Sequence, residues 1–236
     1  MNINMKNKPF AIIGGMGPQA SAYMYNRLID CTIKVFKVKN NDEFPEILIL
    51  SVPVPDFISN EENKKKALEM LTDRVKQLNK LEISYLSITC NTAHILLPYL
   101  QKVSKKPFVS MIDEVTKTIK KNGVKTVGLL ASPTTIRSQL YQQKLEEKNI
   151  KTIIPNKTNQ THIEKIIRNI IAGKSQLSDK KKSISIADDL VSKGAKAILL
   201  GCTELPLIFP EKYKKPIFNC VDILSISLLH KYYQNN

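Results

Sequence analysis

The sequence contains no long apolar run. None approaches the roughly 18 residues that a membrane-spanning helix needs. The first apolar run, residues 10–13, is too short for the core of a signal peptide, and polar, lysine-bearing residues precede it. With 42% hydrophobic and 24% charged residues, the 236-residue chain has the composition of a globular protein. We therefore expect a cytoplasmic protein with no membrane partner.

Arginine is scarce although the chain is strongly basic. Lysine and arginine together number 36, giving a formal net charge of +15, yet only four of them are arginine. The lysine runs at 64–66 and 180–182 lie in polar segments without interleaved aromatic residues, unlike a surface that stacks on bases. This pattern favours a solvated basic face, which attracts small acidic molecules. We expect a small-molecule substrate and no nucleic acid.

Metal-binding patterns are also missing. The four cysteines form no CxxC pair, and the three histidines lie far apart in the sequence. No zinc-ligand spacing is therefore present. In a cytosolic chain of this size, cysteines are expected to be free thiols. We expect neither a metal nor a disulfide.

Three segments of the first half of the chain recur in the same order in the second half. One is a strand with its turn, one is a strand that ends in cysteine, and one is a KP motif that ends in aspartate. The matched pairs are 10–18 with 126–133, 84–90 with 197–202, and 106–113 with 215–222. Three matches in the same order indicate a duplication.

The duplication predicts the fold class. Strands that alternate with helices form parallel sheets. We expect an α/β protein of two pseudo-symmetric domains, each a short, mainly parallel sheet flanked by helices. The first domain is placed at 1–113 with 211–236, where the C-terminal helix completes it, and the second at 114–210.

Two cysteines lie where predicted strands end. Cys90 and Cys202 each follow a short apolar strand and precede hydroxyl and carboxylate side chains. In parallel sheets, ligands bind at the carboxyl edge of the strands. If these edges of the two domains face each other, the two thiols lie across one cleft, related by a pseudo-two-fold axis. We predict the active site there.

Two facing cysteines indicate proton transfer at a carbon atom. A thiol at a helix N-terminus has a lowered pKa, because unpaired N–H groups and the helix dipole stabilise the thiolate. One thiolate can remove a proton from one face of a carbon while the other thiol donates to the opposite face, which inverts the centre. An α-carbanion also needs donors for its carboxylate. The candidate donors are Asn91, Thr92, Ser132, Thr135 and Thr203.

Other polar residues have simpler interpretations. Cys31, on a predicted helix, and Cys220, in a predicted strand, are expected to be small core residues. His94 is expected to pack or to cap a helix. Glu204 equally suits the first turn of a helix, where a carboxylate is favourable.

Three motifs together resemble a known superfamily. IIGGMGP at 12–18, CNTAH at 90–94 and GCTELP at 201–206 are similar to those of the aspartate/glutamate racemases, in particular the aspartate racemase branch. The resemblance spans nearly the whole chain. It implies a homodimer that uses neither pyridoxal phosphate nor a metal. It also implies that Cys90 and Cys202 are the paired acid and base.

The resemblance also assigns substrate contacts. Ser132 and Thr135 would hold the α-carboxylate, and Glu204 marks the branch, because glutamate racemases usually have histidine at that place. The full set implied around the substrate is Met16, Asn91, Thr92, Ser132, Thr135, Thr203 and Glu204. The implied reaction is reversible racemisation of an acidic amino acid, with aspartate as the first choice.

Two positively charged residues of the branch are missing here. Aspartate racemases of the branch have an arginine near the loop after the second strand and a lysine just before the Ala-Gly pair that corresponds to 172–173. Arg168 could substitute for them, or the substrate is not aspartate. The alternatives are a racemase of glutamate or of a broader range of amino acids, a hydantoin racemase or decarboxylase of the same superfamily, and a non-catalytic anion-binding protein.

Overall fold

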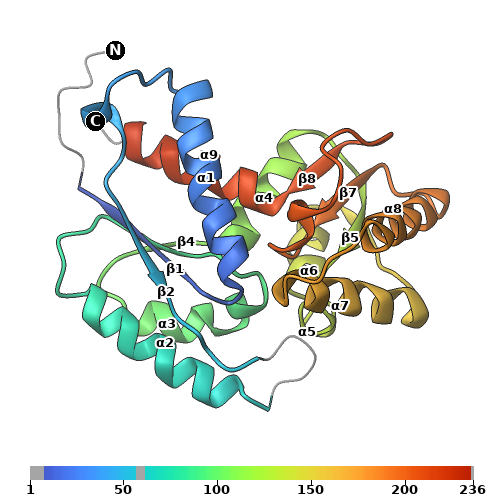
Figure 1. Cartoon of the computed structure of the whole chain (residues 1–236), viewed down its shortest axis with the longest axis horizontal. Helices are drawn as coiled ribbons and strands as arrows, with labels where there is room; N and C mark the ends of the chain where they lie inside the picture. Colours follow the sequence, from blue (N-terminus) through green and yellow to red (C-terminus); the bar gives the residue numbers. More distant parts are fainter. Residues whose placement is uncertain (1–7, 57–61, 235–236) are drawn as a thin grey trace.

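The computed structural model describes residues 8–56 and 62–234 (Figure 1). The first half contains β1 (Phe10–Gly14), α1 (Pro18–Lys34), the 3₁₀ helix η1 (Asn41–Glu43), β2 (Ile47–Ser51), α2 (Lys64–Leu78), β3 (Leu86–Ile88), the 3₁₀ helix η2 (Thr92–Leu96), α3 (Leu97–Val103), β4 (Phe108–Val109) and α4 (Met111–Lys121). The second half contains β5 (Thr126–Leu130), α5 (Pro133–Arg137), α6 (Leu140–Glu146), β6 (Lys151–Ile153), α7 (Lys157–Ile171), α8 (Leu177–Ser192), β7 (Ala197–Leu200), the 3₁₀ helix η3 (Leu205–Leu207), β8 (Ile217–Asn219) and α9 (Cys220–Gln234).

Some features considered in the sequence lie outside the described ranges. They are most of the polar N-terminal stretch and the end of the loop after β2, from Phe57 on. Within the described ranges, no helix is both long enough and apolar enough to cross a membrane.

The two sheets have the same topology. Their strand orders are β2-β1-β3-β4 and β6-β5-β7-β8, and every pairing is parallel. On the first sheet Ala11 pairs with Leu86, and at the equivalent place on the second sheet Val127 pairs with Ala197. The predicted duplicated α/β fold is confirmed. Strands β3 and β7, which precede the two cysteines, occupy the same place in their sheets.

Each sheet has helices on both faces. Along β1, Phe10 and Ile12 belong to one apolar cluster, and Ala11 and Ile13 belong to another. This alternation arises because successive strand residues point to opposite faces. Helices α2 and α3 cover the outer face of the first sheet, and α7 and α8 cover that of the second.

The inner faces of the two sheets share one apolar core. It joins side chains of β1 and β5 with those of α1, α4, α6 and α9. Helix α9 packs against α1 and α4, and α4 packs in turn against α6 (Figure 1). The last helix of each half therefore packs on a helix of the other half, which fixes the two sheets relative to each other.

The proposed domain division stays a prediction. Helix α9 packs on α1 of the first half, as the division at 1–113 with 211–236 expects. Strand β8, however, hydrogen-bonds to β7 of the second sheet. The strand pairing therefore favours a boundary after Asn219 rather than at residue 211.

Local structure differs from the sequence-based expectation near Cys90, Cys202 and Cys220. The residues after Cys90 and Cys202 form the short 3₁₀ helices η2 and η3 rather than α-helices. Cys220 was expected in a strand, but it is the first residue of α9. The strand ends one residue earlier because the side chain of Asn219 accepts the N–H of Val221, at 3.0 Å, and starts the helix.

Gly15 allows the turn after β1 to lie against the loop after β2. Its φ is +90°, and its N–H donates to Ser21 Oγ at 2.9 Å. A Cβ atom built on Gly15 would lie 2.3 Å from the backbone nitrogen of Val52. Any side chain would therefore force the turn and the loop apart.

We predict that Gly15→Ala lowers the free energy of unfolding by about 2–4 kcal/mol, because a left-handed backbone and a backbone overlap add together. Urea denaturation measures this loss. The matched control is Gly123→Ala, whose φ is +70° but whose Cβ would meet nothing within 4 Å. The control should lose only about 1 kcal/mol. Equal losses in the two variants would contradict the close approach.

Candidate active site

The two predicted catalytic cysteines lie at equivalent strand ends. Cys90 follows β3 and Cys202 follows β7, and their residues are only 8% and 7% exposed. Cys202 Sγ donates to Glu204, and Glu204 also accepts the backbone N–H of Gly17 in the turn after β1, so the segment that carries Cys202 contacts the first half. The structure therefore brings both halves of the duplication to one place.

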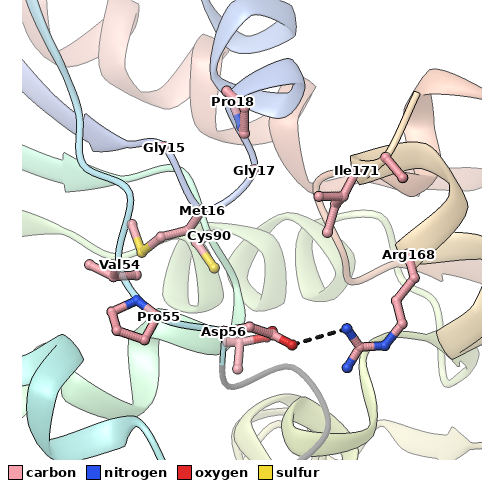
Figure 2. A pocket seen from close by; sticks show the side chains of 12 residues that line it. Gly15, Met16, Gly17, Pro18, Val54, Pro55, Asp56, Cys90, Arg168 and Ile171 are labelled. Carbon is pink, nitrogen blue, oxygen red and sulfur yellow. Dashed lines mark hydrogen bonds and ion pairs between the residues drawn. The ribbon is translucent and has the colours of Figure 1, made fainter.

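A pocket of about 280 Å³ opens beside Cys90 (Figure 2). The turn after β1, the loop after β2 and the last turns of α7 enclose it. Of the residues predicted from the sequence to form the site, Met16, Cys90 and Thr92 line this pocket. The predicted residues that do not line it are Asn91, Ser132, Thr135, Cys202, Thr203 and Glu204. The complete lining is Gly15, Met16, Gly17, Pro18, Val54, Pro55, Asp56, Cys90, Thr92, Arg168, Ile171 and Ala172.

Three hydroxyl groups meet at the boundary of the two halves. Thr92 Oγ1 lies 2.9 Å from Ser132 Oγ and 3.1 Å from Thr135 Oγ1, and Ser132 Oγ donates to Thr135 Oγ1 at 2.9 Å. Ser132 is the N-cap of α5 and also accepts the backbone N–H of Thr135. All three side chains are buried. Because hydroxyl groups rotate, this cluster can turn its hydrogens toward a carboxylate.

A buried carboxylate contacts the second cysteine. Cys202 Sγ donates to Glu204 Oε2 at 3.0 Å, and Thr203 Oγ1 donates to the same oxygen at 3.1 Å. The backbone N–H of Gly17, in the other half, donates to Glu204 Oε1 at 3.4 Å. Burial raises the pKa of Glu204, although these hydrogen bonds oppose the rise. Glu204 is thus placed to exchange a proton with the Cys202 thiol.

The expected lowering of the cysteine pKa values is wrong. Burial, together with the charge of Glu204, raises the pKa of Cys90 to about 12. Backbone N–H groups of Thr92 and Ala93 favour the thiolate but do not outweigh these effects. The same two causes raise the pKa of Cys202. In the protein without substrate, both side chains are therefore thiols at neutral pH.

Asn91 is held by side chains that the sequence did not single out as its partners. Its Oδ1 accepts a hydrogen bond from Tyr141, and its Nδ2 donates to Cys220 Sγ at 3.3 Å. Asn91 thus ties the segment after β3 to α6 and α9, and its role in substrate binding stays a prediction. Cys220 is fully buried in the shared core, as its interpretation as a core residue expects.

His94 positions the segment that carries Cys90. Its Nε2 accepts the backbone N–H of Met111 at 3.0 Å, so its Nδ1 carries the hydrogen that is donated to Cys90 O at 2.8 Å. Burial lowers the pKa of His94 to about 4, which keeps the ring neutral. The packing role expected from the sequence fits these contacts.

An ion pair between the halves also lines the pocket. Arg168 of α7 binds Asp56 Oδ2 at 3.0 Å (Figure 2). It also binds Glu164 Oε1 at 3.1 Å. The sequence drew attention to Arg168 as a substitute cation, but it gave no sign that Asp56 would be its partner. In the sequence, Ile171 stands where the branch has a lysine, and Ala172 begins the Ala-Gly pair that follows. In the structure both residues lie at the end of α7 and line the pocket. Within the described ranges, no cluster of three or more histidine, cysteine or acidic side chains could hold a metal.

The two parallel-sheet halves enclose one pocket between the carboxyl end of the first sheet and the end of α7. The chain belongs to the Asp/Glu/Hydantoin racemase family, whose model matches residues 13–225. It is therefore an enzyme of the isomerase class.

Known proteins of several specificities are similar to this chain. The aspartate racemase of Picrophilus torridus is 29% identical, with a TM-score of 0.82 over 95% of this chain and 94% of that one. PH1733 of Pyrococcus horikoshii OT3, an aspartate racemase homologue, is 28% identical, with a TM-score of 0.79 over 95% and 99%. The broad specificity amino-acid racemase RacX of Bacillus subtilis is 25% identical over 82% of this chain and 84% of its own length.

We predict that Glu204→Gln makes Cys202 more reactive toward iodoacetamide. Removing the carboxylate charge lowers the pKa of this thiol, so the midpoint of the pH–rate curve for alkylation shifts to lower pH. Cys90 and Cys202 lie in different tryptic peptides, so mass spectrometry follows each rate separately. Glu69→Gln, on an exposed part of α2, serves as the control and should leave the curve unchanged. An unshifted curve for Glu204→Gln would contradict the electrostatic coupling.

Proposed function

We propose that this chain racemises an amino acid without a cofactor, using Cys90 and Cys202 as acid and base on opposite faces of the α-carbon. The observation that carries the proposal is the placement of the two buried thiols: they follow equivalent strands of the two halves, Cys90 lines the pocket, and Glu204 connects Cys202 to the pocket residue Gly17. A pair of groups related in this way can act from opposite sides of a bound carbon atom.

Glu204 can accept the proton that Cys202 must lose before it acts as a base. Both cysteines are thiols before substrate binds, so one of them must lose its proton first. Glu204 Oε2 accepts the hydrogen of Cys202 and can take that proton. The Cys202 thiolate then removes the α-proton, and Cys90 donates its own proton to the opposite face. The reaction ends with Cys202 as a thiol, Cys90 as a thiolate and Glu204 still protonated, which is the starting state for the reverse direction. Gain of a proton by Cys90 and loss of the proton from Glu204 restore the resting enzyme.

The negative charge that develops on the substrate must be stabilised by hydrogen-bond donors. Removing the α-proton shifts negative charge onto the α-carboxylate, so groups that bind this carboxylate stabilise the transition state. The hydroxyl groups of Thr92, Ser132 and Thr135 form a cluster next to Cys90 and suit this task. The remaining substrate contacts in the proposal are Met16, which lines the pocket, Thr203, which contacts Glu204, and Asn91 and Glu204 themselves.

The substrate is acidic in one version of the proposal and not in the other. Aspartate follows from the resemblance and from similarity to named aspartate racemases, and Arg168 would then hold the second carboxylate. A broader or neutral substrate range follows from the similarity to RacX and from the apolar side chains of the pocket.

The other candidate functions differ in what an assay would show. A hydantoin racemase would act on hydantoins and a decarboxylase would release carbon dioxide from its substrate, whereas an anion-binding protein would show ligand-induced stabilisation without turnover. A homodimer and a cytoplasmic location, both expected from the sequence, stay predictions.

We predict that Cys90→Ala and Cys202→Ala each lower the racemisation rate at least 10²-fold, the usual contribution of one acid or base group. Chiral chromatography of a panel of amino acids, with no cofactor added, measures the rate. Cys31→Ala is the control, because Cys31 lies on α1 in the core away from the pocket. With a single enantiomer as substrate, the variant that lacks the abstracting cysteine also loses α-hydrogen exchange in deuterated water, whereas the other variant can retain it. Full exchange of the same enantiomer in both cysteine variants would contradict the two-cysteine mechanism.

A further inference from the structure

We propose that the preferred substrate has an uncharged, apolar side chain, which packs between Met16, Val54 and Pro55 on one side and Ile171 and Ala172 on the other. The inference rests on the proposed racemase activity and narrows its substrate class. The five residues line the pocket beside Cys90, and Figure 2 shows Met16 and Val54 next to this cysteine with Ile171 across from them.

The two apolar walls come from different halves and are held together. The main chain at Ile171 accepts a hydrogen bond from Gln19 Nε2 of α1, at 2.9 Å. A Cβ atom built on Gly17 would lie 3.4 Å from Ile171 Cγ1, which is ordinary van der Waals distance. The end of α7 therefore lies directly against the turn after β1, and a side chain placed in the pocket contacts both.

The charges of the pocket disfavour an acidic substrate. Arg168 is the one cation among the described lining residues, and it already binds two carboxylates, Asp56 and Glu164. A substrate carboxylate would be the third around one guanidinium. Beyond this ion pair, the side-chain walls offer apolar surface, where an unpaired carboxylate is costly to bury. An aliphatic side chain gains free energy from the same surface.

Helix geometry makes Ile171 the position that decides selectivity. Arg168, Ile171 and the C-cap residue Ala172 are spaced i, i+3 and i+4 along the end of α7, so they share one face of the helix. Arg168 is turned toward Asp56 at the far end of the pocket, while Ile171 lies closer to the turn after β1 (Figure 2). A cation at 171 would meet a substrate side chain without first breaking an ion pair. The volume of about 280 Å³ is at the small end for ligand pockets and suits a free amino acid.

The test compares exchange of the α-hydrogen in deuterated water for L-methionine, L-leucine, L-aspartate and L-lysine. We expect kcat/KM for methionine or leucine to exceed that for aspartate and for lysine by at least about 10-fold. A faster rate with aspartate would overturn the apolar assignment and leave the racemase function standing, and so would a faster rate with lysine, which Asp56 could bind. Absence of exchange with all amino acids would contradict the racemase function itself, and the assignment with it.

A charge placed in the wall tests the same assignment on the protein side. Ile171→Lys should raise the aspartate-to-methionine ratio of kcat/KM at least about 10-fold, because it gives the substrate carboxylate a partner. Thr161→Lys adds the same charge on an exposed part of α7 and should leave this ratio unchanged. An unchanged ratio in Ile171→Lys, or an equal change in both variants, would overturn the proposal.

Discussion

The apolar core shared by the two sheets is the constraint on which the site depends. Side chains from α1, α4, α6 and α9 fill the space between the inner faces of both sheets. Because α9 packs on α1, and α4 packs on both α6 and α9, neither half can move without disturbing the other. The carboxyl ends of β3 and β7 are thereby held near each other. The hydrogen bonds from Gly17 to Glu204 and from Gln19 to Ile171 span the same boundary. The packing of the shared core therefore also fixes the contacts at the pocket.

Burial then determines the chemistry of the site. The enclosure that brings two thiols together also raises the pKa of each, so the fold itself disfavours the thiolate that proton abstraction needs. The negative charge of Glu204 adds to this effect, but in the proposed mechanism the same carboxylate accepts the proton that Cys202 must lose. Glu204 contacts Cys202, whereas Cys90 has backbone N–H groups of Thr92 and Ala93. The two halves are duplicated in topology, yet the two thiols have different surroundings.

Sequence periodicity and repetition were sufficient to predict the fold and the location of Cys90 and Cys202 at equivalent strand ends. Alternating apolar residues such as those of β1 identify a strand with two buried faces, and the repeated cysteine contexts identify equivalent strand ends. The remaining features depend on contacts between residues far apart in the chain. The pKa directions follow from burial, which spacing does not report. The contact of Asn91 with Tyr141, and that of Asp56 with Arg168, join segments 50 and 112 residues apart. Local conformation also matters, because Gln139, with a φ of +55°, interrupts the helical segment after β5 and separates α5 from α6.

The central claim is that one group removes the α-proton from one face of the carbon and a second group donates a different proton to the opposite face. The most direct measurement follows the first turnovers of a single enantiomer in deuterated water and determines the isotope at the α-carbon of both enantiomers by chiral separation and mass spectrometry. The account predicts that the product enantiomer carries one solvent deuterium, while the recovered substrate still carries its original hydrogen. A product that retains the substrate's own hydrogen, or deuterium that enters both enantiomers equally from the start, would show that one group serves both faces and would contradict the account.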